Sequence, residues 1–132
     1  MTTLPGTIVL AAASLFSLAT SASSFRAPRR FGERLGFILP GADGVNEVRA
    51  QYGGFFLAVA LAGGAALAGL IPRQAGLVVL ATVFGGLILG RLVSLALDGN
   101  ARAYGPTIRA LFVVDALGLA ASLAAYAAEA AR

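Results

Sequence analysis

One apolar run, residues 76–99, constrains the fold of this chain more than any other stretch. It reads GLVVLATVFGGLILGRLVSLALDG, so it is apolar almost throughout, yet it contains Arg91 in its second half and Asp98 near its end. An apolar run of this length predicts a helix that crosses a membrane. Because an ionisable side chain inside such a helix is costly unless protein or water surrounds it, the other helices must provide a polar environment for Arg91.

The composition of the 132-residue chain also predicts an integral membrane protein. Hydrophobic residues make up 58% of the chain and charged residues only 12%, whereas a soluble domain is nearer to half apolar and a quarter charged. The apolar residues are concentrated in four blocks, which predicts one all-α domain, an antiparallel bundle of four membrane-spanning helices. The expected spans are about residues 4–25, 46–71, 76–98 and 107–130, and a basic segment, 26–45, joins the first two.

The basic segment 26–45 allows two interpretations. Its apolar residues, such as Phe31 and Phe37, lie among Arg29, Arg30 and Arg34. This mixture suits a short amphipathic helix in the headgroup region of the membrane. An ordinary basic loop would have the same composition, so both interpretations stay open.

The arginines predict how the bundle is oriented in the membrane. All ten basic residues are Arg, and eight of them lie at one end of the expected bundle: Arg26, Arg29, Arg30, Arg34, Arg49, Arg91, Arg102 and Arg109. The positive-inside rule then places segment 26–45 and the connection between spans three and four in the cytoplasm. Both termini would lie on the non-cytoplasmic side of a bacterial inner membrane. Charges placed in this way set topology and do not form a nucleic-acid-binding stripe, so we expect no nucleic-acid partner.

The residue types that are absent limit the chemistry. The chain has no Cys and no His, which excludes disulfides, thiol chemistry, imidazole-ligated metals and His-based acid–base catalysis. The pattern contains neither a nucleophile beside a general base nor a metal-ligand cluster. We therefore predict a protein that is not an enzyme and has no catalytic residues, no metal and no cofactor.

One polar constellation is expected in the cytoplasmic half of the bundle. By the helical rise, Arg91 and Asp115 each lie roughly 10–12 Å along their helices from the cytoplasmic end, which predicts an ion pair between them. A second pair, Arg49 with Asp98, is expected nearer that end, where Asp98 needs a cation to offset the helix dipole. The complete candidate set is Asn46, Glu47, Arg49, Tyr52, Arg91, Asp98 and Asp115.

Two hypotheses for this constellation remain open. In the first, the ion pairs and tyrosine hydroxyls fix the register of the helices. In the second, the same groups form a pocket for an anionic headgroup, a quinone-like ring or a proton. Asn46 and Glu47 lie at the expected start of the second span. Asn46 is expected to cap that helix, and Glu47 is expected to interact favourably with its positive N-terminal end.

Small residues recur at every fourth position on three spans. Such stripes let helix backbones approach closely inside lipid, so we predict that they form helix contacts. The residues predicted for helix packing are Gly54, Ala58, Ala62, Gly86, Gly90, Ala116 and Ala120.

Three parts of the sequence carry a resemblance to a known family. They are NEVRAQYGG at 46–54, FGGLILGRLVSLALDG at 84–99 and the acid Asp115. Together they resemble a bacterial family of small four-span membrane proteins known only as a domain of unknown function, over roughly residues 46–115. The resemblance implies the four-span fold and the choice of polar residues, and it implies no activity. By analogy alone, the chain is also similar to small four-helix proteins that accompany oxidoreductases.

Two functional hypotheses follow. The favoured one is an accessory or assembly subunit of a larger inner-membrane complex, respiratory or photosynthetic, because the small-residue stripes exceed what one four-helix core uses. Its partners would be the lipid bilayer and other membrane protein chains, with lipid, quinone or pigment at its surface. The alternative is a binder or carrier of a small lipophilic anion, a quinone or a lipid headgroup, which would use Arg49, Arg91 and Asp115.

Overall fold

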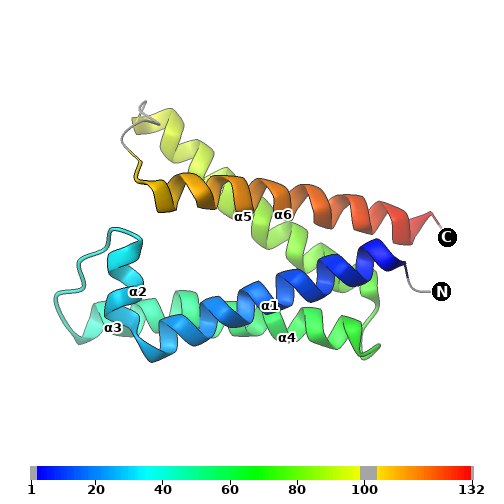
Figure 1. The fold of residues 1–132 in the computed structure, drawn as a ribbon, viewed down its shortest axis with the longest axis horizontal. Coiled ribbons are helices and arrows are strands. Elements are labelled where there is room, and N and C mark those ends of the chain that lie inside the picture. Colours follow the sequence, from blue (N-terminus) through cyan, green and yellow to red (C-terminus); the bar gives the residue numbers. More distant parts are fainter. Residues whose placement is uncertain (1–2, 99–103, 132) are drawn as a thin grey trace.

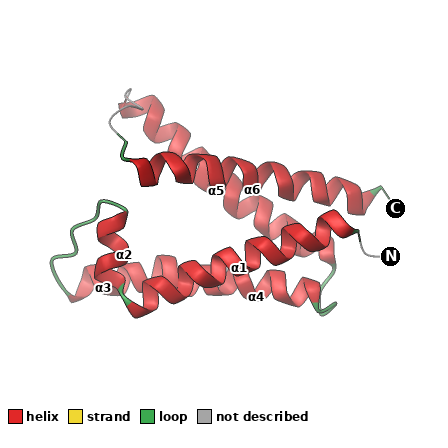
Figure 2. Cartoon of the chain, viewed as in Figure 1, coloured by secondary structure: helices red, strands yellow, loops and turns green. Residues whose placement is uncertain are grey.

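The structure is a computed structural model that describes residues 3–98 and 104–131. Throughout this part the chain is helical, with short connections and no strand (Figure 2). The helices are α1 (Leu4–Arg26), α2 (Pro28–Arg34), α3 (Ala42–Val48), the π-helical segment η1 (Arg49–Gly54), α4 (Phe55–Leu67), α5 (Arg73–Asp98) and α6 (Pro106–Ala130).

Four helical segments in the described part are long and apolar enough to cross a membrane. They are Leu4–Arg26, Ala42–Leu67, Arg73–Leu97 and Pro106–Ala130, the second of which combines α3, η1 and α4. Figure 1 shows that successive long helices run in opposite directions and that both termini lie at the same end. The predicted all-α, four-span bundle is confirmed, and the chain is a multi-pass membrane protein.

The bundle consists of two antiparallel helix pairs. The most extensive helix contacts are those between α1 and α4 and those between α5 and α6. The pairs meet around a core in which Leu10, Leu77 and Leu80 are fully buried and Phe84 is almost so. This core lies toward the half of the molecule that holds the termini, while α2 and α3 lie at the opposite end (Figure 1).

Close helix approach depends on glycines other than those predicted. A Cβ added at Gly76 would lie 2.6 Å from the Cβ of Ala66, and one added at Gly118 would lie 2.6 Å from the Phe84 ring. By contrast, Ala62 is only half-buried, and the other six residues predicted for helix packing are exposed: Gly54, Ala58, Gly86, Gly90, Ala116 and Ala120. The four-residue spacing of small residues identified one face of each helix. Because lipid and the protein core are both apolar, this spacing could not show whether that face contacts lipid or another helix.

The ends of the second span differ from the prediction. The span begins at Ala42 after the extended residue Gly41, so Asn46 lies inside the helix and does not cap it. It ends at Leu67 because Gly69, at φ 74°, closes a Schellman motif in which the Leu70 N–H donates to the Ala65 carbonyl at 2.9 Å. Glycine adopts this left-handed conformation without steric cost.

The connections on either side of the second span have local structure of their own. Pro72, which follows the expected end of the second span at residue 71, precedes α5, and its carbonyl accepts hydrogen bonds from the Ala75 and Gly76 N–H groups at the start of that helix. In the basic segment 26–45, residues Pro28–Arg34 form α2, with Pro28 in its first turn, where the missing N–H costs nothing. Pro28 and Gly32 are buried, whereas the charged residues of α2 are exposed, as expected for an amphipathic helix.

Candidate functional site

The ion pair predicted between the third and fourth spans is confirmed. The Nε of Arg91 on α5 donates to Oδ2 of Asp115 on α6 at 2.5 Å. The Arg91 side chain is 19% exposed and the Asp115 side chain 3% exposed. A carboxylate this deeply buried is very costly without a cation beside it, so the two groups depend on one another.

An aromatic ring completes the environment of Arg91. The guanidinium carbon lies 5.7 Å from the centroid of the Phe112 ring, which is within the range of a cation–π interaction. Phe112 precedes Asp115 by three residues on α6, so both side chains lie on the same helix face. One face of α6 thus contributes both a counter-charge and a π surface to a guanidinium on α5.

Tyr52, on η1, belongs to an aromatic cluster. Its ring packs against Phe31 and Phe56, with centroid distances of 5.1 Å and 6.2 Å. Tyr52 also lines one cavity with Leu87, which lies one turn before Arg91 on α5. The second span therefore approaches α5 close to the ion pair.

The remaining predicted site residues lie elsewhere. Glu47 is exposed and accepts a hydrogen bond from Gln51 on its own helix at 3.0 Å. Asn46 and Arg49 line a cleft next to α2. The expected pair of Arg49 with Asp98 depends on the Asp98 side chain, which lies outside the described residues.

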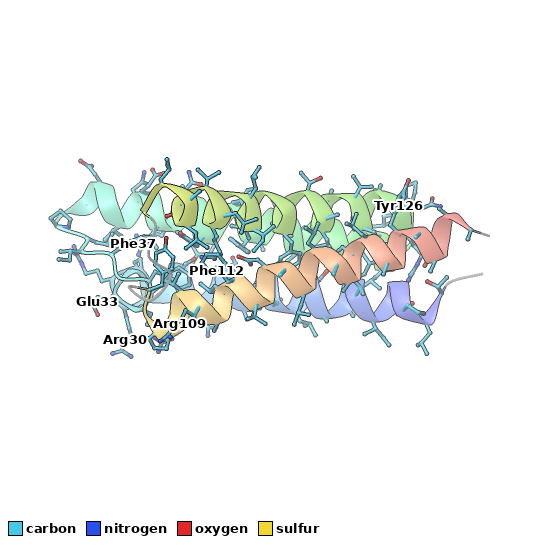
Figure 3. The ribbon with its side chains drawn as sticks, turned by 90° about the horizontal axis from the view of Figure 1, so that it is seen from above. Arg30, Glu33, Phe37, Arg109, Phe112 and Tyr126 are labelled. Atoms are coloured by element: carbon cyan, nitrogen blue, oxygen red, sulfur yellow. The ribbon has the colours of Figure 1, made fainter. Side chains whose placement is uncertain are left out.

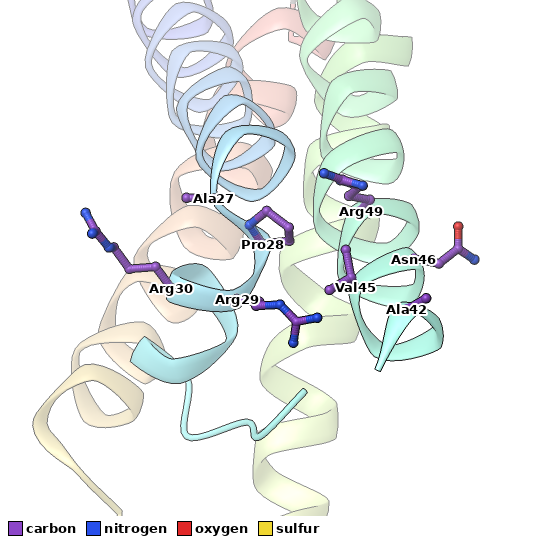
Figure 4. Close-up of a pocket in the computed structure, with 8 residues that line it drawn as sticks. All are labelled: Ala27, Pro28, Arg29, Arg30, Ala42, Val45, Asn46 and Arg49. Atoms are coloured by element: carbon purple, nitrogen blue, oxygen red, sulfur yellow. The ribbon is translucent and has the colours of Figure 1, made fainter. Parts of the chain in front are cut away.

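A cleft lies beside Arg49, between α2 and the second span. It has a volume of about 740 Å³ and is lined by Ala27, Pro28, Arg29, Arg30, Ala42, Val45, Asn46 and Arg49. Figure 4 shows the guanidinium groups of Arg29 and Arg49 on opposite sides of the gap between α2 and the second span, whereas Arg30 and Asn46 point away from it. Arg29 also donates to the Leu39 carbonyl at 2.6 Å, which fixes its side chain.

A π-helical segment positions the polar residues of the second span. η1 comprises Arg49–Gly54 and lies between the two α-helical parts of that span. π-Helical turns are rare and often occur at functional sites. Here the segment begins at Arg49, which lines the cleft, and contains Tyr52, which lines a second cavity together with Leu87 of α5. The ring of Phe25 packs so closely on Gly53 that an added Cβ would lie 2.7 Å from it.

A second ion pair, at the opposite end of the bundle, was not predicted. Arg73 Nε lies 3.1 Å from Glu129 Oε1, and the Arg73 Nη2 group donates to Thr7 Oγ1 at 2.8 Å. The Thr3 hydroxyl also donates to Glu129 at 2.6 Å. The same comparison of depths that paired Arg91 with Asp115 would have paired Arg73, at the start of one span, with Glu129, at the end of the next.

The two ends of the bundle differ in chemical character. The end with the termini carries the closed network of Arg73, Glu129 and two threonines. The other end carries exposed arginines, and Figure 3 shows Arg30 and Arg109 there, far from Tyr126. Among residues 3–98 and 104–131, no group of three or more acidic, His or Cys side chains is placed to hold a metal ion.

Comparison with known proteins identifies the family of this chain. Residues 6–113 match the model of a domain of unknown function, DUF4345, and the chain belongs to this family. No curated protein matches the chain, and no solved structure matches it either.

Proposed function

We propose that this member of the DUF4345 family is a non-enzymatic accessory or assembly subunit of a larger complex, respiratory or photosynthetic, in the bacterial inner membrane. In this proposal both termini lie on the non-cytoplasmic side, and the end that carries α2 and α3 lies in the cytoplasmic leaflet. The positive-inside rule supports this orientation, because exposed arginines gather at that end.

The observation that carries the proposal is that small residues face away from the bundle. A Cβ built at Gly86 or at Gly90 would meet no atom within 4 Å, and both residues are exposed on α5. The exposed Ala116 and Ala120 give α6 a similar surface. Small residues on a lipid-facing surface allow a helix of another chain to pack closely. Inside this bundle they have no such role.

Native electrophoresis after extraction in a mild detergent tests the proposal. The wild-type chain should migrate with other membrane proteins as a larger complex. The Gly86→Leu/Gly90→Leu variant should lose that association, because two leucine side chains would hold a neighbouring helix away. Its thermal unfolding midpoint should be no lower than that of the wild type, since both side chains would enter open space and replace helical glycines.

The control is Ala121→Leu, which places a leucine at an exposed position of α6 outside the stripe. It should leave the complex intact. Migration of the wild type only as a monomer or small homo-oligomer would contradict the accessory role. Retention of the complex by Gly86→Leu/Gly90→Leu would contradict the assignment of the α5 face.

A second candidate is a binder or carrier of a small lipophilic anion, a quinone or a lipid headgroup near Arg91. It is supported by a mostly apolar cavity of about 440 Å³ beside this region, whose lining includes Phe37, Tyr52 and Leu87. It is the weaker candidate because Asp115 already satisfies Arg91. Native mass spectrometry tests it: a retained ligand that Arg91→Ala loses would support it, and a ligand-free wild type would contradict it.

A further inference from the structure

The cleft between α2 and the second span has the charge distribution of an anion site. Its lining contains three arginines and Asn46 and no acidic residue. Arg29 and Arg49 approach from different helices on opposite sides of the gap (Figure 4). Among the described residues, Arg49 has neither an ion pair nor a hydrogen bond from its side chain, in contrast to Arg73 and Arg91.

The position of the cleft matches the headgroup layer of a membrane. Its lining residues Ala27 and Pro28 directly follow Arg26, where the first span ends. On the other wall, Arg49 follows the start of the second span at Ala42 by seven residues, which is roughly 10 Å along a helix. One wall thus lies where the first span ends, and the other covers the first two turns of the second span, from Ala42 to Arg49.

Local structure fixes the Arg29 side chain and the helix segment that carries Arg49. The hydrogen bond from Arg29 to the Leu39 carbonyl fixes one of them. Arg49 is the first residue of η1, and one turn further along the helix the Phe25 ring packs on Gly53. This contact joins α1 to the second span. The Arg29 side chain is therefore fixed by a hydrogen bond, and the helix segment that carries Arg49 is packed against α1.

We propose that this cleft binds the phosphate group of an anionic phospholipid, held between the guanidinium groups of Arg29 and Arg49. Arginine is well suited to phosphate because its planar N–H groups match two phosphate oxygens. Basic pockets at the cytoplasmic ends of spans are typical sites for anionic headgroups. The site is separate from the Arg91–Asp115 pair and does not depend on the proposed accessory role, so variants of each can be interpreted independently.

Native mass spectrometry of the full chain in a mild non-ionic detergent tests this proposal. The protein is incubated with equal amounts of phosphatidylglycerol, which is anionic, and phosphatidylcholine, which has no net charge. Wild type should retain phosphatidylglycerol in preference. Arg29→Gln/Arg49→Gln should retain roughly 30-fold less of it, because each arginine near an anionic lipid contributes a factor of about five.

The control variant is Arg34→Gln/Arg109→Gln, which removes two exposed arginines that do not line the cleft. It should bind phosphatidylglycerol within about twofold of the wild type. Because Arg29 also bonds to Leu39, Arg49→Gln alone serves as a second variant, with about fivefold weaker binding and unchanged thermal unfolding.

Three results would overturn the proposal. Equal retention of phosphatidylglycerol by the Arg29→Gln/Arg49→Gln variant and the wild type would show that the cleft is not the site. An equal loss in the control would show that net charge alone attracts the lipid. If inorganic phosphate at the same concentration displaced phosphatidylglycerol from the wild type, the site would be one for free phosphate and not for a lipid.

Discussion

The Arg91–Asp115 pair leads to the most quantitative prediction, a double-mutant cycle. The single variants Arg91→Met and Asp115→Ala each leave one charged partner alone inside the bundle. Removing one partner of a fully buried pair costs about 3–5 kcal/mol. The Arg91 side chain is still 19% exposed, and polar contacts between membrane helices are on average weaker than a fully buried ion pair. We therefore expect each single variant to lose about 2–3 kcal/mol of unfolding free energy.

The double variant, Arg91→Met/Asp115→Ala, should behave differently because it leaves no unpaired charge. Its loss of unfolding free energy should be smaller than the sum of the two single losses by about 2 kcal/mol. The assay is unfolding in mixed detergent micelles by titration with a denaturing detergent, followed by far-ultraviolet circular dichroism.

Val113→Ala is the control for this cycle, because Val113 lies on the same helix and is 58% exposed. It should change the unfolding free energy by less than about 0.5 kcal/mol. Single losses that add to within about 0.5 kcal/mol in the double variant would refute the reasoning, because the two side chains would then act independently.

Three further predictions concern packing, the network near the termini and the turn after α4. Gly118→Ala should lower the unfolding free energy by about 1–3 kcal/mol, because the new methyl group would meet the Phe84 ring. Gly86→Ala places its methyl group in open space and should raise the unfolding free energy by up to about 1 kcal/mol. Both are measured by the same detergent titration. Glu129→Gln should speed amide hydrogen exchange in the first turns of α1, as measured by mass spectrometry, because Thr3 and Arg73 would lose a charged acceptor; unchanged exchange would contradict this role. Gly69→Ala should cost about 1 kcal/mol in that titration, because Gly69 has a positive φ, and an unchanged midpoint would contradict it.

The sequence was sufficient to predict the fold and the central ion pair. Both follow from physical rules that act along one helix at a time: the apolar length needed to cross a membrane, and the 1.5 Å rise that sets the depth of each charge. Arg91 and Asp115 meet because the connection between their helices is short and the helices are antiparallel. Arg91 also needs an oppositely charged partner, because a charged side chain inside a membrane span is costly in most other environments.

Features that depend on how the helices are rotated about their axes could not be predicted. In water, the exposed face of a helix is polar, and the sequence shows it. In a membrane both faces are apolar, so nothing in the sequence separated exposed residues such as Gly86 from buried ones such as Gly76. The π-helical segment inside the second span likewise has no propensity signal, although it contains both Arg49 and Tyr52.

Site-specific labelling tests the central claim, that the chain crosses the membrane four times and so brings Arg91 and Asp115 to one depth. The chain contains no cysteine, so single variants can be labelled with a maleimide that does not cross membranes. We choose Gly41→Cys, between α2 and α3; Ala68→Cys, after α4; and Ala131→Cys, after α6. Gly41→Cys should react only from the cytoplasmic side, in inverted vesicles, and the other two variants only from the opposite side. Labelling of Gly41→Cys and Ala68→Cys from the same side would contradict this claim, because the second helix would then not cross the membrane.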